Sequence, residues 1–392
     1  MSKWKTVRLG DVCEILNGYA FKSDKYVDSG IRVIRITNVQ KGFIEDNSPA
    51  FYPITEKENI KDYELYENDL LISLTGNVGR VAQLSKEMLP AALNQRVGCI
   101  RIKDNNLLIS YLFTYLNSDK FESDCVFFAR GIAQKNMSTE WLKKYLIPLP
   151  SIEEQKKIAL ELEKCSKLIS KYQKQLLNFD TLIKSRFIEM FGDPVANPKG
   201  WKVRKLESIA DIVSGITKGR KTRETELIEV PYMAVSNVKS GYIDWSTIKT
   251  IEATKTEIAM YQLKVNDVLM TEGGDPDKVG RGALLTTVPK NCIHQNHIFR
   301  VRLHNISPIY FSQYLQHEKS KRYFLSCAKQ TTGIASINMT QLKSLPVLIP
   351  FEKQQNDFAS FVQQIDKSKF AVQKSLKKAE TLYKSLMQEY FG

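Results

Sequence analysis

The chain has 392 residues, enough for two or three domains, and its 43% hydrophobic and 26% charged residues are typical of a globular protein. No apolar run approaches the roughly 18 residues of a membrane-spanning helix, and the first residues contain no apolar signal core. The six cysteines are scattered and never form a Cys-x-x-Cys pair. We therefore expect a cytoplasmic protein with neither a disulfide framework nor a zinc site.

The net charge of +14 favours a polyanionic partner such as nucleic acid. The excess is uneven along the chain, because residues 1–150 carry a net +2 and residues 193–350 carry +8. Residues 151–192 and 351–392 contribute +2 each. If the first part of the chain binds DNA, it must do so through a local basic patch.

The chain is an internal repeat with an offset of 197 to 202 residues. Five short motifs recur in the same order: Trp4-Lys5 and Trp201-Lys202, Asn68-Asp69 and Asn266-Asp267, Val78-Gly79-Arg80 and Val279-Gly280-Arg281, Gly131-Ile132-Ala133 and Gly333-Ile334-Ala335, and Phe191-Gly192 and Phe391-Gly392. A unit of about 200 residues has therefore been duplicated.

The first part of each repeat mixes short strands with one helix. Runs rich in Val, Ile and Leu predict three strands in each copy, at 31–36, 70–74 and 97–102 and at 230–235, 267–271 and 298–303. A helix is predicted near 107–122 and again near 308–324. Prolines end each such domain: Pro148 and Pro150, Pro346 and Pro350.

The last 40 residues of each repeat carry a seam of residues that are alternately three and four positions apart. The first seam consists of Ile158, Leu162, Cys165, Ile169, Tyr172, Leu176, Phe179, Ile183, Arg186 and Met190. The second consists of Phe358, Val362, Ile365, Lys369, Val372, Leu376, Ala379, Tyr383, Leu386 and Tyr390. The flanking positions are mostly polar, so each segment is predicted to be a long coiled-coil helix, with Arg186 and Lys369 as destabilising exceptions.

Local signals define the ends of the first long helix. Ser151 can cap it, with Glu154 three residues further on, and Gly192-Asp193-Pro194 should end it. A helix of 40 residues is about 60 Å long.

The two helices can bury both seams by pairing antiparallel. Level ends would place Ile169 opposite Ala379, Tyr172 opposite Leu376, and Phe179 opposite Lys369, whose aliphatic stem could lie along the ring. This pairing predicts a dumbbell with a pseudo-twofold axis, which suits two different DNA half-sites in opposite orientation. The alternative is that each helix packs on its own globular domain.

Several repeated motifs act together as a signature. They are Trp-Lys-x-x-x-Leu near each start, Asn-Asp-Leu/Val-Leu followed by Val-Gly-Arg, and the turns Leu149-Pro150…Gln155 and Ile349-Pro350…Gln355. The junction from Met190-Phe191-Gly192-Asp193-Pro194 to Asn197-Pro198-Lys199-Gly200-Trp201 is especially characteristic. With these motifs the whole chain resembles the specificity subunits of type I restriction-modification enzymes.

The repeat and the resemblance together predict an α+β fold. Two homologous α/β target recognition domains, residues 1–150 and 201–350, would be separated by a long antiparallel two-helix coiled coil in a pseudo-twofold dumbbell. The spacer helices would be residues 151–192 and 351–392, with a linker at 193–200.

The resemblance also implies the function of a non-catalytic subunit. Each head would read one half of a bipartite, asymmetric target in double-stranded DNA, and the helices would fix the spacing and dock two modification subunits. Those methyltransferases would bind S-adenosylmethionine and methylate adenine, and restriction or translocase subunits that use ATP and Mg would join them. No cofactor and no metal are expected in this chain.

Direct readout of DNA requires polar or basic side chains on loops. Three recurring loops qualify. The first loop supplies Thr75, Asn77 and Arg80 in the first copy and Lys278 and Arg281 in the second. The second loop supplies Asn94, Gln95 and Arg96 in the first copy and Gln295, Asn296 and His297 in the second. The third loop supplies Arg130, Gln134 and Lys135 in the first copy and Thr331, Thr332 and Ser336 in the second. Each loop also has a structural interpretation. The first would be a glycine hairpin with a surface arginine, the second a polar cap of a strand, and the third an Asn-containing turn.

Two further places are weaker candidates. Lys218, Arg220 and Lys221 form a basic cluster after Gly215, and Lys22 occupies the corresponding place in the first copy. Such a cluster more often positions phosphate or is simply solvated than it contacts bases. The pair Thr37-Asn38-Val39 and Ser236-Asn237-Val238 is as compatible with a structural role as with a functional one.

No motif supports an enzyme that acts alone. The chain has no P-loop and no Asn/Asp-Pro-Pro-aromatic motif, and Pro276-Asp277 lacks the partner residues of a nuclease. His294 and His297 with Cys292 are weak metal candidates, because the first copy has no equivalent set. The alternatives that remain are a stand-alone bipartite DNA-binding regulator, a specificity subunit of a related methyltransferase or nuclease system, and a coiled-coil scaffold that binds no DNA.

Overall fold

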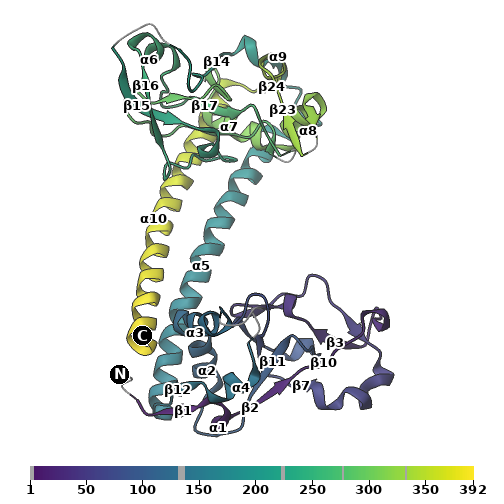
Figure 1. Cartoon of the computed structure of the whole chain (residues 1–392). Coiled ribbons are helices and arrows are strands. Elements are labelled where there is room, and N and C mark those ends of the chain that lie inside the picture. The colour runs from purple at the N-terminus through teal and green to yellow at the C-terminus, as the bar shows by residue number, and fades with distance from the viewer. Residues whose placement is uncertain (1–3, 131–136, 222–225, 276–277, 332) are drawn as a thin grey trace. The chain divides into compact units, whose positions relative to one another are not determined.

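The computed structural model describes residues 4–130, 137–221, 226–275, 278–331 and 333–392 (Figure 1). The chain divides into two compact units, unit 1 with residues 1–173 and 374–392 and unit 2 with residues 174–373. Each unit consists of one head together with the adjoining halves of both long helices. Among the described residues, no helix has both the length and the apolar character to cross a membrane.

The first head is built on two sheets of four strands within the described residues. One sheet has the order β2-β11-β8-β9, with strands Cys13–Asn17, Val97–Ile102, Leu70–Ser73 and Val81–Gln83. The other has the order β6-β3-β10-β7, with strands Phe51–Tyr52, Ile31–Ile34, Ala91–Leu93 and Glu64–Leu65. Two antiparallel pairs complete it: β1 (Thr6–Arg8) with β12 (Leu146–Pro148), and β4 (Val39–Gln40) with β5 (Phe43–Ile44).

The second head repeats the four-stranded sheet of the first. This sheet has the order β14-β21-β17-β19, with strands Ala210–Ser214, Ile298–Leu303, Val268–Thr271 and Gly282–Leu284. A second sheet has the order β16-β15-β20, with strands Lys249–Ala253, Ile228–Met233 and Ile293–His294. Strand β13 (Lys202–Lys205) pairs with β24 (Pro346–Ile349) as β1 pairs with β12.

A third sheet in the second head differs from the sequence-based expectation. Its order is β18-β23-β22, with strands Gly273–Gly274, Ile334–Ser336 and Lys329–Thr331. The sequence predicted loops in both regions, because strands this short show no alternating pattern. Elsewhere the strands at 97–102 and 298–303 have the predicted bounds, and the other four lie within two residues of them.

The prediction of a single helix in each head is wrong, because the structure has two consecutive helices there. In the first head α2 (Ile109–Leu116) ends before α3 (Asp119–Arg130). Asn117 Nδ2 donates to the Phe113 carbonyl at 2.9 Å, and Ser118 Oγ accepts from the Phe121 N–H at 3.2 Å. These bonds end one helix and cap the next.

The same break recurs in the second head between α7 (Pro308–Gln316) and α8 (Glu318–Cys327), where His317 Nδ1 accepts from the Lys319 N–H at 3.2 Å. The remaining α-helices of the described heads are short: α1 (Leu9–Val12), α4 (Thr139–Lys144), α6 (Lys255–Tyr261) and α9 (Met339–Lys343). Single 3₁₀ turns or short 3₁₀ helices lie at Ser23–Lys25, Ile36–Asn38, Ile54–Tyr63, Lys86–Met88, Leu206–Ser208 and Val235–Asn237.

The two long helices are α5 (Ile152–Phe191) and α10 (Glu352–Phe391). Ser151 Oγ accepts from the Glu154 N–H at 3.3 Å, as expected for the cap of α5. Every predicted seam residue is buried or half-buried, whereas most flanking residues are exposed. The periodicity therefore identified the buried stripe of each helix correctly.

The helices pair antiparallel in both units, as Figure 1 shows for the C-terminal end of α10 beside the first turns of α5. In unit 1, Tyr390 donates its hydroxyl hydrogen to Glu161 at 2.5 Å. In unit 2, Lys369 Nζ donates to Asp180 at 2.5 Å. The ammonium of Lys369 therefore pairs with the residue after Phe179, as a half-buried cation needs an anionic partner.

Aromatic side chains at the helix ends close the core of each head. In unit 1 the ring centroid of Phe391 lies 5.2 Å from that of Tyr115 and 5.9 Å from that of Tyr111. In unit 2 Phe191 lies 4.8 Å from Tyr310. The helices thus pair with each other, as the seams predict, and the last residue of each also packs into the core of the head at that end.

The junction after α5 explains one repeated motif. Gly192 has φ 78°, and a Cβ there would lie 2.6 Å from the Pro198 ring. Lys199 Nζ donates to the last carbonyls of α5, at 2.8 Å from Met190 O, and Trp201 Nε1 donates to Phe191 O at 2.8 Å. The Phe-Gly…Pro-Lys-Gly-Trp motif is therefore a C-terminal helix cap.

Candidate nucleic-acid interface

The repeated Asn-Asp motif is a structural clamp in each head. Asp69 accepts from Arg101 at 2.8 Å and 2.7 Å, and its side chain is only 3% exposed. Asp267 holds Arg302 in the same bidentate way, at 2.7 Å and 2.8 Å. Ion pairing with Asp69 raises the pKa of the Arg101 guanidinium, and the bidentate pair fixes the start of the strand that follows.

In the first head the three predicted loops meet at the end of β8. The Leu74 N–H donates to the Arg96 carbonyl of the second loop at 3.1 Å. The Met137 N–H, just after the third loop, donates to the Leu74 carbonyl at 2.8 Å. One residue after β8 therefore joins all three loops.

The second head has the same junction at the end of β17. The Glu272 N–H donates to the His297 carbonyl at 3.0 Å, and the Ile337 N–H donates to the Glu272 carbonyl at 2.8 Å. Strand pairing adds to it, because Gly273 lies opposite Ser336 in the β18–β23 ladder. The loops that were selected separately from the sequence thus form one surface in each head.

A fourth segment joins this surface through a close backbone approach. A Cβ on Gly18 would lie 2.2 Å from the backbone of Asn94, and one on Gly215 would lie 2.0 Å from the carbonyl of His294. The next residues then bond to the second loop, since the Gln95 N–H donates to Tyr19 O at 2.9 Å and the Asn296 N–H donates to Ile216 O at 3.0 Å. The segments that continue to Lys22 and to Lys218 start from this contact.

The described candidate residues divide evenly by exposure. Eight side chains are exposed: Lys22, Asn77, Gln95, Arg96, Lys218, Lys221, Lys278 and His297. Eight are half-buried: Thr75, Arg80, Asn94, Arg220, Arg281, Gln295, Asn296 and Ser336. Gln134, Lys135 and Thr332 lie outside the described residues, as do the side chains of Arg130 and Thr331.

The backbone of the first loop is organised from within. Ser73 Oγ donates to the Asn77 carbonyl at 2.5 Å and accepts from the Arg80 N–H at 3.0 Å. Gly79 has φ 84°, and a Cβ there would lie 2.7 Å from Cys125. The Arg80 guanidinium donates to Gln40 at 2.5 Å. The glycine hairpin is therefore held by its own hydrogen bonds, and Asn77 is exposed at its tip.

Arg220 is engaged inside the second head. Its guanidinium donates to Glu257 at 2.8 Å and 2.5 Å and to the Glu252 carbonyl at 2.9 Å. The Arg220 guanidinium holds the pKa of the Glu257 carboxyl below its usual range. Within the basic cluster, Lys218 and Lys221 are thus better placed to contact DNA than Arg220.

Two polar motifs from the sequence are structural. Asn38 is buried, with Oδ1 accepting from the Arg35 N–H at 2.9 Å and Nδ2 donating to the Glu45 carbonyl at 2.8 Å. Asn237 makes the equivalent bonds to Ala234 and Asp244, both at 2.9 Å. Both asparagines anchor the turn that follows a strand.

The weak metal candidates do not form a site. His294 is buried, with ring nitrogens 3.0 Å from the Tyr261 carbonyl and 3.3 Å from the Val213 carbonyl. His297 is exposed and pairs with Glu272. Among the described residues, no group of three His, Cys, Asp or Glu side chains could hold a metal ion.

Sequence reasoning missed two residues of this surface. Tyr19 is 36% exposed beside the second loop, and its ring lies 5.1 Å from Phe21. Glu272 was missed because its counterpart in the first copy is Leu74, which is buried. A search for positions where an apolar residue in one copy is replaced by a charged residue in the other would have found Glu272. Only the fold shows that Tyr19 lies beside the second loop.

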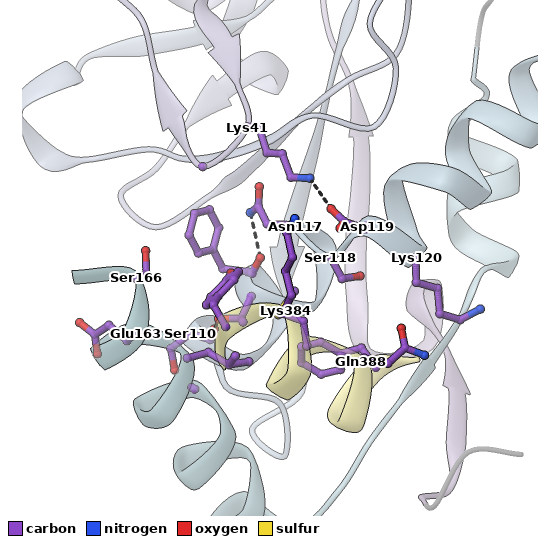
Figure 2. Close-up of a pocket in the computed structure, with 18 of the residues that line it drawn as sticks. Lys41, Ser110, Asn117, Ser118, Asp119, Lys120, Glu163, Ser166, Lys384 and Gln388 are labelled. Carbon is purple, nitrogen blue, oxygen red and sulfur yellow. Dashed lines mark hydrogen bonds and ion pairs between the residues drawn. The ribbon is translucent and has the colours of Figure 1, made fainter. Parts of the chain in front are cut away.

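Each unit also has a cleft between its head and the helix pair. In unit 1 the cleft has a volume of about 840 Å³. Figure 2 shows Glu163 and Ser166 of α5, Lys384 and Gln388 of α10, and Lys41, whose Nζ lies 3.0 Å from Asp119. The wall is mixed polar and apolar, as protein-binding clefts commonly are.

The cleft of unit 2 lies at the equivalent place and has a volume of about 800 Å³. It is lined by Gly241 from the loop before β16, by Ser312 from α7, by Asp366 from α10 and by Lys184 from α5. The duplication has therefore produced two clefts with the same surroundings and different side chains.

The geometry defines a duplicated protein in which each head gathers the same three polar loops at one strand end. A family model for the type I restriction modification DNA specificity domain matches residues 1–178 and 198–380. The specificity subunit of the type I restriction enzyme EcoKI from Escherichia coli K12 is 22% identical over 415 residues, which cover 99% of this chain and 88% of that subunit. That of EcoBI from Escherichia coli is 20% identical, covering 99% and 85%.

Solved structures give the same fold. The S subunit of a type I restriction-modification system from M. genitalium aligns with a TM-score of 0.59 at 14% identity, covering 100% of this chain and 96% of that one. A chain from a study of complex assembly and conformational transition of the type I R-M system aligns with a TM-score of 0.56 at 19% identity, covering 99% and 97%. The chain therefore belongs to the type I restriction modification DNA specificity family, the non-catalytic DNA-recognition subunits of these enzymes.

Proposed function

We propose that each head reads one half of a bipartite, asymmetric DNA target for a type I restriction-modification enzyme in the cytoplasm. The supporting observation is that both heads join three loops at one strand end but carry different side chains there. The same position is occupied by Arg96 in the first head and by His297 in the second. A common scaffold that carries different base-contacting side chains would give two unequal half-sites.

Charge supports DNA as the ligand, most directly for the second head. Residues 193–350 carry a net +8, and Lys218, Lys221 and Lys278 are exposed there. The first head has little net charge, so its affinity depends on local groups such as Arg96 and Lys22. DNA affinity of the assembled complex should fall steeply with salt, because each phosphate contact releases counterions.

The test is a map of methylated adenines in cells that contain the full chain and its modification subunit. The expected motif has two unequal parts with unspecified bases between them. Arg96→Ala should relax one part and His297→Ala the other, whereas Lys61→Ala, an exposed lysine on the 3₁₀ helix Ile54–Tyr63, should change neither. A single uninterrupted motif, or one altered as a whole by either variant, would refute the proposal.

The partners are two modification subunits, one for each unit. The equivalent clefts beside the helix pair support this stoichiometry, because two sites with the same surroundings suit two copies of one partner. S-adenosylmethionine would be bound by the modification subunits. ATP and Mg would be bound by restriction or translocase subunits, and this chain would bind none of them.

Native mass spectrometry of the co-purified complex tests the partner sites. Lys384→Glu and Lys184→Glu change equivalent positions, one in each cleft. Each should reduce two bound modification subunits to one, and the double variant should retain none. Lys171→Glu, at an exposed position of α5 that lines neither cleft, should retain both. If the double variant also retains two copies, the partners bind elsewhere.

A further inference from the structure

The two heads differ in chemistry at the residue that joins their loops. In the first head this residue is Leu74, an apolar side chain that is 6% exposed. In the second head it is Glu272, whose carboxylate is 35% exposed and lies 2.5 Å from Nδ1 of His297. Of these two equivalent residues, only Glu272 places a carboxylate beside the second loop of its head.

This contact determines the hydrogen-bonding state of His297. An ionised carboxylate only accepts, so Nδ1 must carry the ring hydrogen. In the neutral imidazole Nε2 is then an acceptor, and Nδ2 of Asn296 lies 3.4 Å from it. A chain of three polar side chains thus runs from Asn296 through His297 to Glu272.

The backbone holds these side chains in place. Glu272 bonds through its N–H to the His297 carbonyl and through its carbonyl to the Ile337 N–H. Asn296 bonds through its N–H to Ile216 O, and its carbonyl accepts from Ser214 Oγ at 2.5 Å. The group thus spans two segments and is bonded to two more, at Ser214–Ile216 and at Ile337, which is the preorganisation that selective recognition requires.

The first head offers the opposite chemistry at the same place. Arg96 is exposed and can only donate hydrogen bonds, which suits the acceptors O6 and N7 of guanine. An imidazole with Nε2 as an acceptor suits an exocyclic amino group, N4 of cytosine or N6 of adenine.

We propose that Glu272 is a positioning residue for base recognition by the second head. It holds His297 so that Nε2 exchanges its long contact with Asn296 Nδ2 for a hydrogen bond from the amino group of a cytosine or adenine in the major groove. This inference rests on the proposed function of the head. Glu272 itself acts through His297 and does not touch the base.

The experiment selects preferred sites from a random DNA library with the full chain in complex with its modification subunits. Glu272→Leu installs the residue of the first head, which fits this position there. The preference for an amino-bearing base at one position of one half-site should fall about tenfold or more, while the other half-site is unchanged. Glu272→Gln should restore most of the preference, because its carbonyl oxygen can still accept from Nδ1.

A second variant tests the reversal of chemistry. Glu272→Leu combined with His297→Arg reproduces the pair Leu74 and Arg96, and should shift the preference at the same position toward guanine. Unchanged thermal unfolding would show that both variants fold. If the wild-type motif is bipartite but Glu272→Leu leaves every position unchanged, the role of Glu272 is refuted. If the wild type selects no bipartite motif, the proposed function itself fails.

Discussion

A buried glutamine ties each long helix to its head, and the bonds of Gln155 show how. Its Oε1 accepts from the Leu108 N–H at 2.8 Å, and its Nε2 donates to the carbonyls of Asn106 at 2.8 Å and Pro150 at 2.9 Å. Gln155→Leu would leave these backbone groups without partners in the interior. We expect the free energy of unfolding of unit 1 to fall by about 2–4 kcal/mol in urea denaturation.

The matched control for this prediction is Gln173→Leu, at an exposed position of the same helix. It should change the free energy of unfolding by less than about 0.5 kcal/mol. Gln355 in unit 2 bonds in the same way to the Ser307 N–H and the Pro350 carbonyl, each at 2.8 Å. Equal effects of the buried and the exposed substitution would show that these bonds do not stabilise the unit.

His294 makes the stability of unit 2 depend on pH. Burial lowers its pKa to about 4, and as a neutral ring it can donate to only one of its two carbonyl neighbours. Because its folded-state pKa lies below the unfolded value of about 6.5, the unfolded chain binds the proton first as pH falls. The free energy of unfolding should therefore fall by about 3 kcal/mol between pH 6.5 and pH 4, and level off below.

Two measurements check this prediction. Urea denaturation of the His294→Gln variant should lose that part of the pH dependence, even if the variant is less stable at pH 7. The imidazole signals of the wild type, followed by NMR, should include one ring that titrates near pH 4. A wild-type pH profile retained in the variant would contradict the assignment.

At the scale of elements, the long helices were the most predictable part of the fold. Their seams repeat over 40 residues, so individual exceptions such as Lys369 do not hide the pattern. The break between α2 and α3 was not predictable in the same way, because it depends on bonds made by Asn117 and Ser118 that compete with the helix. The strands β18 and β23 exist because segments far apart in sequence pair with each other.

The candidate surface shows the same limit. Its loops could be found from the sequence because they recur after recognisable strands. Their meeting at Leu74 and at Glu272 could not, because it rests on backbone bonds between distant segments. The ion pair of Arg220 could not be predicted for a related reason, since the carboxylate that engages it lies 37 residues away.

The C-terminal end of α10 should stabilise the first head. Phe391 is 4% exposed and its ring packs on Tyr111 and Tyr115. Phe391→Ala would leave a cavity at this site, and we expect the free energy of unfolding of unit 1 to fall by about 3–5 kcal/mol. Hydrogen exchange should show faster exchange in α2, while α7 in unit 2 keeps its protection. Leu382→Ala, at a 52% exposed position of α10, should alter neither.

At the scale of the whole molecule, the two repeats share the residues that stabilise each unit but differ in the exposed residues of their loops. The parts that hold each unit together recur with the same residue types, such as Asp69 with Arg101 and Asp267 with Arg302. The exposed residues at the loop junction do not recur. We therefore expect that a few surface substitutions in one head can change its half-site and leave the helix pair and the other head intact.

The helix pair should set the distance between the two half-sites, and its length can be changed without changing either head. One heptad inserted after Gln173 and one after Gln373 preserves both seams, because seven residues are one full repeat of each seam. Seven residues lengthen a helix by about 10 Å, so the gap in the methylated motif should grow by about three base pairs. Each half-site should keep its bases, as read by mapping methylated adenines. An unchanged gap with altered half-site bases would mean that the helices do not measure the distance along the DNA.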